Sequence, residues 1–232
     1  MTEDPAAQVA ERAEAEAEAK AADRVVFFSD AVIAIASTLL ALELPIPPDL
    51  PHHAYTNLGL LHALRDDWTS YLDFLISFLV IGNHWLSHRH IFRYVCRTDS
   101  LVGRLNMLWL LMMIATPYAT KLLSGDGARG TRFAVYALIQ IIATLCLLGM
   151  SREIGRAGLL RPDAPESARH PDPLPYLAWV LVFLVSVPVA FATAWAYAIW
   201  ALMPATTRGL RWLRQRQSGR PAPEVPGGSA RN

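Results

Sequence analysis

Long apolar runs are the feature of this sequence that most constrains its fold. A helix needs about 20 predominantly apolar residues to cross the hydrocarbon core of a bilayer. The chain has runs of this kind at 25–44, 71–92, 101–123 and 133–150. Charged residues make up only 18% of the chain, against about 25% in soluble domains. The sequence therefore predicts an all-α integral membrane protein that lies in a lipid bilayer.

A fifth apolar stretch, residues 174–203, is longer than one span and shorter than two. Because Pro188 lies near its middle, this stretch is either one long kinked helix or a tight hairpin at 186–188, with the second span extended by 206–213. Loops rich in arginine face the cytoplasm, and arginines follow the second run, the fourth run and the last run. Six spans place these groups and both termini on the cytoplasmic side, whereas five would strand the basic C-terminus outside. We therefore predict six transmembrane helices, with the third-to-fourth loop as a mildly basic exception.

Composition divides the chain into three parts. Residues 1–23 are an acidic, Ala/Glu-rich cytoplasmic segment, 24–213 form the six-helix transmembrane domain, and 214–232 form a polar cytoplasmic tail. The first segment lacks the basic start and apolar centre of a cleavable signal peptide, and it is either a solvated helix or a disordered tail. Lysine is rare beside arginine among the 21 basic residues, which is typical of GC-rich genomes. We therefore expect a multi-pass protein of a bacterial cell membrane.

Several functional classes lack their sequence signatures. The net charge is +1 and no basic block is present, so nucleic acid is not an expected partner. The two cysteines form no CxxC pair, and the chain contains no G-x-S-x-G, Walker A, H-E-x-x-H or T-V-G-Y-G motif. His84 and His88 have the i, i+4 spacing of a metal pair, but no second histidine cluster accompanies them. We expect no catalytic residue, cofactor or metal, and we expect His88 and His90 at the membrane interface; a metal enzyme built on His84 and His88 is the remote alternative.

The first apolar run has two distinct helical faces. At about 100° per residue, one face is small and polar, which suits close contact between helices; it comprises Asp30, Ala34, Ser37 and Ala41. A second stripe, centred about 120° away, is apolar apart from one hydroxyl; it comprises Phe28, Ile35, Thr38, Leu39 and Leu42. From periodicity alone, this second stripe could equally contact lipid or the core of a helix bundle.

Asp30 lies inside the first predicted span, where an acidic residue costs a few kcal/mol unless it has a partner or water. Helices rise about 1.5 Å per residue, which puts His84 of the second span and Asn106 of the third at a similar depth. A shared hydrogen-bonded network of Asp30, His84 and Asn106 is therefore expected. It would act either as structural glue between helices or in ion or proton handling.

The motifs of the first three spans resemble those of the transmembrane protein 175 family, the lysosomal potassium channels of animals and their prokaryotic homologues. The first helix carries Arg24-x-x-x-Phe28-Ser29-Asp30, then Ala34-Ile35, Thr38-Leu39-Leu40 and Leu42-Glu43, followed by Pro47. Further matches are Asn83-His84-Trp85, His88-Arg89, Leu105-Asn106 and Thr116-Pro117-Tyr118. The chain has the length of one six-helix repeat, as in prokaryotic members. A departure is Ala31, where the family commonly has glycine.

This resemblance implies a potassium-selective channel that conducts K⁺ passively as a homotetramer, with the first helix of each subunit lining the pore. Matched by motif, Ile35, Leu39 and Leu42 correspond to the apolar constriction, and Thr38 to a hydroxyl ring linked to potassium preference. The remaining matched residues would hold the first helix against the second and third; these are Arg24, Ser29, Asp30, His84 and Asn106.

The main alternative is a proton-coupled or proton-conducting transporter that uses Asp30 and His84 as titrating groups. Flux coupled to pH would distinguish it from a passive potassium channel.

Overall fold

The computed structural model describes residues 5–45, 56–125 and 127–193. All the secondary-structure elements in this part of the chain are helices. The elements in order are α1 (Pro5–Ala41), α2 (Asn57–Asp66), α3 (Trp68–Phe92), α4 (Ser100–Leu123), α5 (Arg129–Arg156), α6 (Glu166–Arg169) and α7 (Leu174–Ala192). The predicted all-α class is therefore confirmed for the described residues.

Within residues 5–45, 56–125 and 127–193, four helices are long and apolar enough to cross a membrane: Gln8–Ala41, Ser100–Leu123, Arg129–Arg156 and Leu174–Ala192. Helix α3 coincides with the second predicted span and has 25 residues, but it carries buried polar side chains, among them Asp73, His84 and His88, that make it less apolar. The sixth predicted helix and the C-terminal tail lie outside the described residues. The number of six spans thus stays a prediction.

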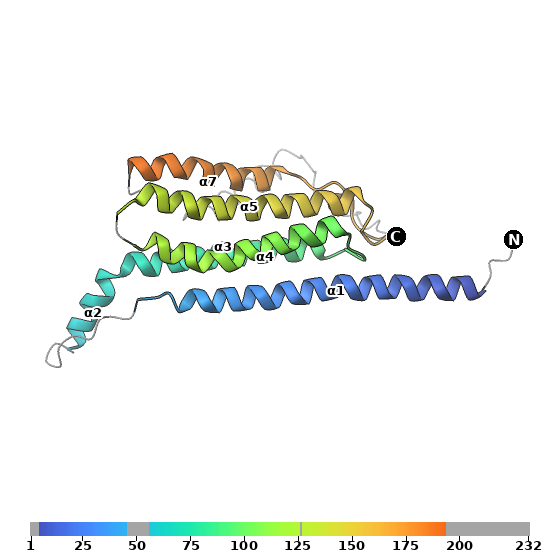
Figure 1. Cartoon of the computed structure of the whole chain (residues 1–232), viewed down its shortest axis with the longest axis horizontal. Coiled ribbons are helices and arrows are strands. Elements are labelled where there is room, and N and C mark those ends of the chain that lie inside the picture. Colours follow the sequence, from blue (N-terminus) through green and yellow to red (C-terminus); the bar gives the residue numbers. More distant parts are fainter. Residues whose placement is uncertain (1–4, 46–55, 126, 194–232) are drawn as a thin grey trace, which may run out of the picture.

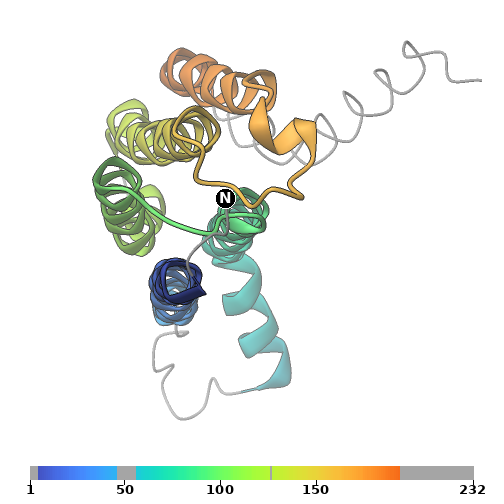
Figure 2. The same cartoon turned by 90° about the vertical axis from the view of Figure 1, so that its right-hand side faces the viewer.

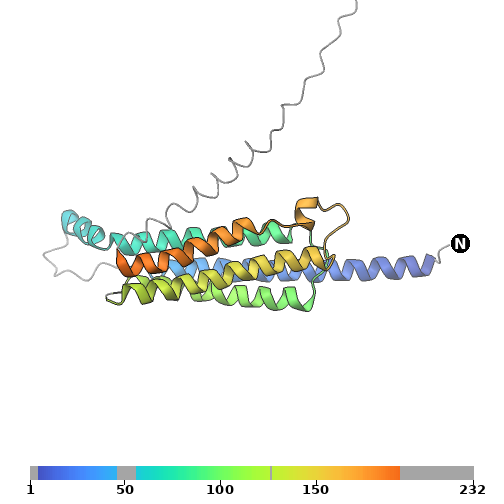
Figure 3. The ribbon, with the colours of Figure 1, turned by 90° about the horizontal axis from the view of Figure 1, so that it is seen from above.

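The five long helices run nearly parallel in one bundle (Figure 1 and Figure 3). Viewed end-on, α1 lies at one edge, against α3 and α4, and α7 lies at the other, against α5 (Figure 2). Helices α3 and α5 end, and α4 and α7 begin, at the end of the bundle that carries the arginine-rich loops, which we call the basic end. At the opposite end, α2 projects away from the bundle (Figure 1).

Two element boundaries differ from the sequence prediction. The expected hairpin at 186–188 is wrong, because α7 continues through Pro188 to Ala192 and the chain becomes extended only at Thr193. A helix can accommodate an internal proline at the cost of one hydrogen bond. The helix that contains the apolar run 133–150 is also longer than that run, since α5 extends to Arg156, whose guanidinium pairs with Glu153 one turn earlier at 2.5 Å.

The segment before the first span is helical where it is described. Helix α1 begins at Pro5 and runs without a break past residue 24 into the predicted span, so of the two alternatives for residues 1–23 the structure has the helix. Its N-terminal part extends well beyond the rest of the bundle (Figure 1).

Local sequence explains where two helices start. The Asp99 carboxylate accepts a hydrogen bond from the Val102 backbone N–H at 2.7 Å and caps α4. The Thr56 hydroxyl caps α2 in the same way through the Gly59 N–H at 3.1 Å. Such caps satisfy backbone donors that have no partner within the helix.

Candidate functional site

Helix α1 buries one narrow stripe against its own bundle. Ser29, Ile33, Ala36 and Leu40 are at most 5% exposed, and their spacing of four, three and four residues places them on one side of the helix. This stripe, which we call the anchored face, packs on α3 and α4. The small-residue face expected to make close helix contact lies about 100° from this stripe. Within the described chain, Asp30 of that face contacts α3, whereas Ala34 and Ala41 are exposed.

The apolar stripe with one hydroxyl lies on another side of α1. Ile35, Leu39 and Leu42 are 59%, 44% and 78% exposed. Thr38 is exposed between them, and its hydroxyl donates to the Ile35 carbonyl at 2.8 Å. That hydroxyl oxygen keeps its capacity to accept hydrogen bonds. We call these four residues the open face of α1, because the described part of the chain leaves them uncovered.

A hydrogen-bonded chain fastens the anchored face to α3 and α4. The Asn106 amide of α4 donates to the Ser29 hydroxyl at 3.0 Å, and the Asn106 carbonyl oxygen lies 2.9 Å from His88 Nε2. The three side chains are nearly inaccessible, at 0–2% exposure. His88 also stacks on Trp109 of α4 with the ring centroids 4.5 Å apart. The expectation that His88 lies at the interface is therefore wrong, whereas Ser29 and Asn106 do meet.

Asp30 has a different partner from those expected. Its carboxylate accepts a hydrogen bond from Trp85 Nε1 at 2.8 Å, and the Arg89 guanidinium lies over the same indole ring, 4.8 Å from its centroid. His84, at the predicted depth, instead accepts a hydrogen bond at Nδ1 from Trp109 Nε1 at 3.4 Å. The network is thus divided into two branches, one through Asp30 and Trp85 and one through Ser29 and Asn106.

Two further predicted features are placed by the same geometry. Arg24 is exposed on α1, one turn before the network. His84 and His88 have separate partners, and no group of three metal-ligating side chains occurs within residues 5–45, 56–125 and 127–193.

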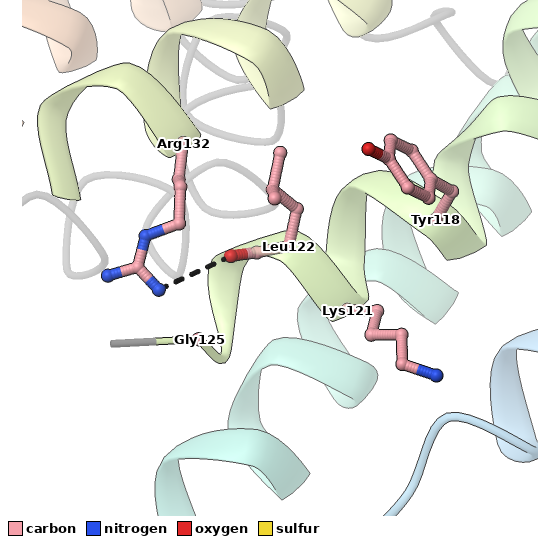
Figure 4. Close-up of a pocket in the computed structure, with 5 residues that line it drawn as sticks. All are labelled: Tyr118, Lys121, Leu122, Gly125 and Arg132. Carbon is pink, nitrogen blue, oxygen red and sulfur yellow. Dashed lines mark hydrogen bonds between the residues drawn. The ribbon is translucent and has the colours of Figure 1, made fainter. Parts of the chain in front are cut away.

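The opposite end of α1 is held by an ion pair. Glu43 lies 2.8 Å from Lys121 Nζ of α4, with the lysine side chain 69% exposed. Beside it, a cavity of about 260 Å³ is lined by Tyr118, Lys121, Leu122, Gly125 and Arg132. Figure 4 shows the Arg132 guanidinium directed at the Leu122 carbonyl and Lys121 pointing away from it. Both basic groups already have partners, so this cavity offers little to a ligand.

A second polar cluster, which sequence reasoning missed, lies inside the bundle toward the same end. Asp73 of α3 is 3% exposed and accepts from the Ser124 hydroxyl at 3.1 Å. Ser77 of α3 is 2.8 Å from Thr120 and 3.1 Å from the Tyr136 hydroxyl. An acidic residue in an apolar run was the signal available, and it applied to Asp73 as well as to Asp30. These contacts join α3, α4 and α5, away from α1.

Comparison with known proteins links these features to a family. Residues 24–117 match the family model described as "Endosomal/lysosomal potassium channel TMEM175". A potassium channel of Streptomyces collinus is 36% identical over 179 residues, which cover 74% of this chain and 83% of that protein. A chicken protein named as an endosomal/lysosomal proton channel, TMEM175, is 36% identical over 107 residues, which cover 44% of this chain and 21% of that protein.

A solved structure shows the same fold. The crystal structure of a lysosomal potassium-selective channel TMEM175 homolog from Chamaesiphon minutus matches with a TM-score of 0.65 and 28% identity. The match covers 83% of this chain and 98% of that one.

Proposed function

Since the chain belongs to the TMEM175 family of potassium channels, we propose that it conducts K⁺ passively across a bacterial cell membrane as a homotetramer, with both termini in the cytoplasm. The observation that carries this proposal is the open face of α1. It holds three exposed apolar side chains and one hydroxyl on the same helix whose other side is anchored by buried hydrogen bonds.

One helix cannot enclose a pore, so the open face must meet copies of itself around a symmetry axis. Rings of Ile35, Leu39 and Leu42 would then form an apolar constriction that gates by excluding water. The stripe carries no charge, so a passing ion is stabilised by retained water and by oxygen atoms. Thr38 supplies the side-chain oxygen within the stripe and would favour potassium, which is more easily dehydrated than sodium.

The small-residue face of Ala34, Ser37 and Ala41 fits the same assembly. It lies about 120° from the open face and about 100° from the anchored face. In a tetramer it would contact the neighbouring subunit, where small side chains allow close approach of backbones. Arg24, Ser29 and Asp30, with His84 and Asn106, would hold α1 in register with its own subunit.

Cysteine substitution along α1 tests the proposal. In a background with Cys96→Ser and Cys146→Ala, single cysteines are introduced in α1 and the potassium flux of liposomes is measured with a thiol-reactive blocker. Block is expected at 35, 38, 39 and 42, and not at 33, 36 and 40 of the anchored face. Block at 34, 37 and 41 instead would show that the small-residue face lines the pore and would contradict the proposal.

A proton pathway is the second candidate function, favoured by the chicken relative's name and by the half-buried Asp30. Parallel flux measurements with a proton gradient and a potassium gradient separate the two candidates. Two results together would favour the proton pathway. The native protein would conduct protons but no potassium, and Asp30→Asn would lose the proton flux.

A further inference from the structure

A large cavity opens between α3, α5 and α7, on the side of the bundle away from α1. It has a volume of about 1070 Å³ and is lined by the end of α3 and the two residues after it (Asn83 to Tyr94), by α5 from Thr144 to Ile154, and by α7 from Leu174 to Val182. Much of the wall is apolar, with Ile91, Leu147 and Leu181 among the lining residues. The loop and short helix α6 between α5 and α7 border it at the basic end (Figure 2).

The cavity spans only half of the bundle. Its α3 wall, from Asn83 to Ile91, rises about 12 Å, less than half of the roughly 30 Å hydrocarbon core. Toward the opposite end the three helices close up, since Phe183 and Ala190 of α7 join one buried cluster with Phe133 of α5 and Val80 of α3. A space of one leaflet's depth suits a lipid acyl chain better than a helix that crosses the whole membrane.

Charged groups lie at its outer border. Arg93 and His90 at the end of α3 line the cavity, and Arg93 lies over the Tyr94 ring at 5.3 Å. The other border carries His170, which is 3.1 Å from Glu166, and Asp172, whose carboxylate accepts from the Leu174 N–H. The carboxylates therefore lie on the α6 side, and Arg93 is the cationic group on the α3 side.

The inner end of the cavity touches the network that anchors α1. His84 lines the cavity and faces the edge of Trp179 of α7, with the ring centroids 6.4 Å apart. From His84, contacts lead through the Trp109 indole to the stacked His88 ring and to Asn106, which donates to Ser29 of α1.

We propose that this cavity binds a phospholipid of the leaflet at the basic end, with one acyl chain between α3 and α7 and the phosphate at Arg93 and His90. The lipid would act on conduction through the contacts that join His84 to α1. This site is separate from the proposed pore and goes beyond the proposed function.

Native mass spectrometry of the full-length protein with added phosphatidylglycerol tests the binding. Ala178→Trp places an indole in the cavity, and Arg93→Gln removes the cation. Each is expected to reduce the bound lipid at least about threefold relative to the native protein. Ala192→Trp, at the exposed far end of α7, and Arg104→Gln, whose guanidinium bonds its own helix at Ser100, should leave it unchanged.

Equal lipid retention by all four variants overturns the proposal and leaves residues beyond 193 or water to occupy the space. If Ala178→Trp fails to fold, Arg93→Gln and its control still decide. Potassium flux in phosphatidylcholine liposomes with increasing phosphatidylglycerol tests the coupling: a response in the native protein that is absent in Ala178→Trp supports it. A binding site without any flux response would overturn the coupling, and potassium flux without lipid binding would overturn the site while the channel function stands.

Discussion

The anchored and open faces of α1 share one helix and the same depth but have opposite surroundings. The anchored face is nearly inaccessible and combines apolar packing with a buried hydroxyl that has partners. The open face exposes Ile35, Leu39 and Leu42 although each is at least as apolar as its buried neighbours. Large apolar side chains gathered on one uncovered stripe indicate a surface that meets something other than the chain's own core. Helix α1 is therefore fixed by its own chain on one side, and its other side is left for the assembly proposed above.

The largest expected effect comes from making the open face polar. Replacing Leu39 with Asn should wet the constriction and raise the potassium leak of liposomes about tenfold or more, equivalent to at least about 1.4 kcal/mol off the barrier. Ala41→Asn, exposed on the small-residue face about 160° from Leu39, serves as the control. If Leu39→Asn assembles normally and its potassium leak is unchanged, the open face does not form the constriction.

On the anchored face, the expected loss is in stability. Asn106→Ala removes the partner of both Ser29 and His88 and leaves buried polar groups unpaired, at a cost of about 1–3 kcal/mol. Thermal melting of the detergent-solubilised protein should fall accordingly. The control is Ser37→Ala, because the Ser37 hydroxyl bonds only the Ile33 carbonyl of its own helix at 2.9 Å. A melting temperature that drops equally in both variants would show that the network contributes nothing specific.

Asp30 sharpens the same contrast, because it joins α1 to α3 through Trp85. Asp30→Ala should destabilise the protein by about 1–3 kcal/mol, whereas Asp30→Asn keeps an acceptor for the indole N–H and should lose less. Melting curves of both variants measure this. Should Asp30→Ala melt like the native protein but lose pH-dependent flux, the structural role would be wrong and the proton pathway would gain.

Thr38 tests whether the one hydroxyl of the open face selects ions. Thr38→Ala should lower the potassium-to-sodium permeability ratio severalfold while conduction persists, and Thr38→Ser should restore much of it because it keeps the hydroxyl. Bi-ionic reversal potentials give the ratio directly. Identical ratios in all three proteins would assign selectivity to another part of the pore.

The smallest effect is expected at the far end of α1. The Glu43–Lys121 ion pair is largely solvent-exposed on the lysine side, and exposed pairs contribute about 0–1 kcal/mol. Lys121→Gln should therefore shift the melting temperature only slightly, with the shift shrinking further at high salt. A loss as large as that of Asn106→Ala would show that α1 is anchored at both ends.

Apolar length predicted α3 and α4 to within three residues at each end, but not the early start of α1 or the full length of α5. Side-chain partners were harder to predict. Depth along the membrane follows from counting residues, and it placed His84 and Trp85 equally well beside Asp30. The direction in which a side chain points does not follow from counting, because adjacent residues on a helix point about 100° apart. The packing of α3 on α1 turns Trp85, and not His84, toward Asp30. The burial of His88 likewise depends on its stacking with Trp109 of α4. The sequence around His88 does not predict this contact.

Helix α1 is continuous for 37 residues, which makes it a rod of about 55 Å. Buried residues from Ala22 to Leu40 seat one length of α1 on the bundle, and an arm of about 26 Å reaches back from Ala22 to Pro5. A tilt of α1 by about 5° displaces the tip of this arm by about 2 Å relative to Ala22. With α1 lining the pore as proposed, a tilt of the pore helix would be carried out to the tip of this arm, and a force on the tip would act back on the pore.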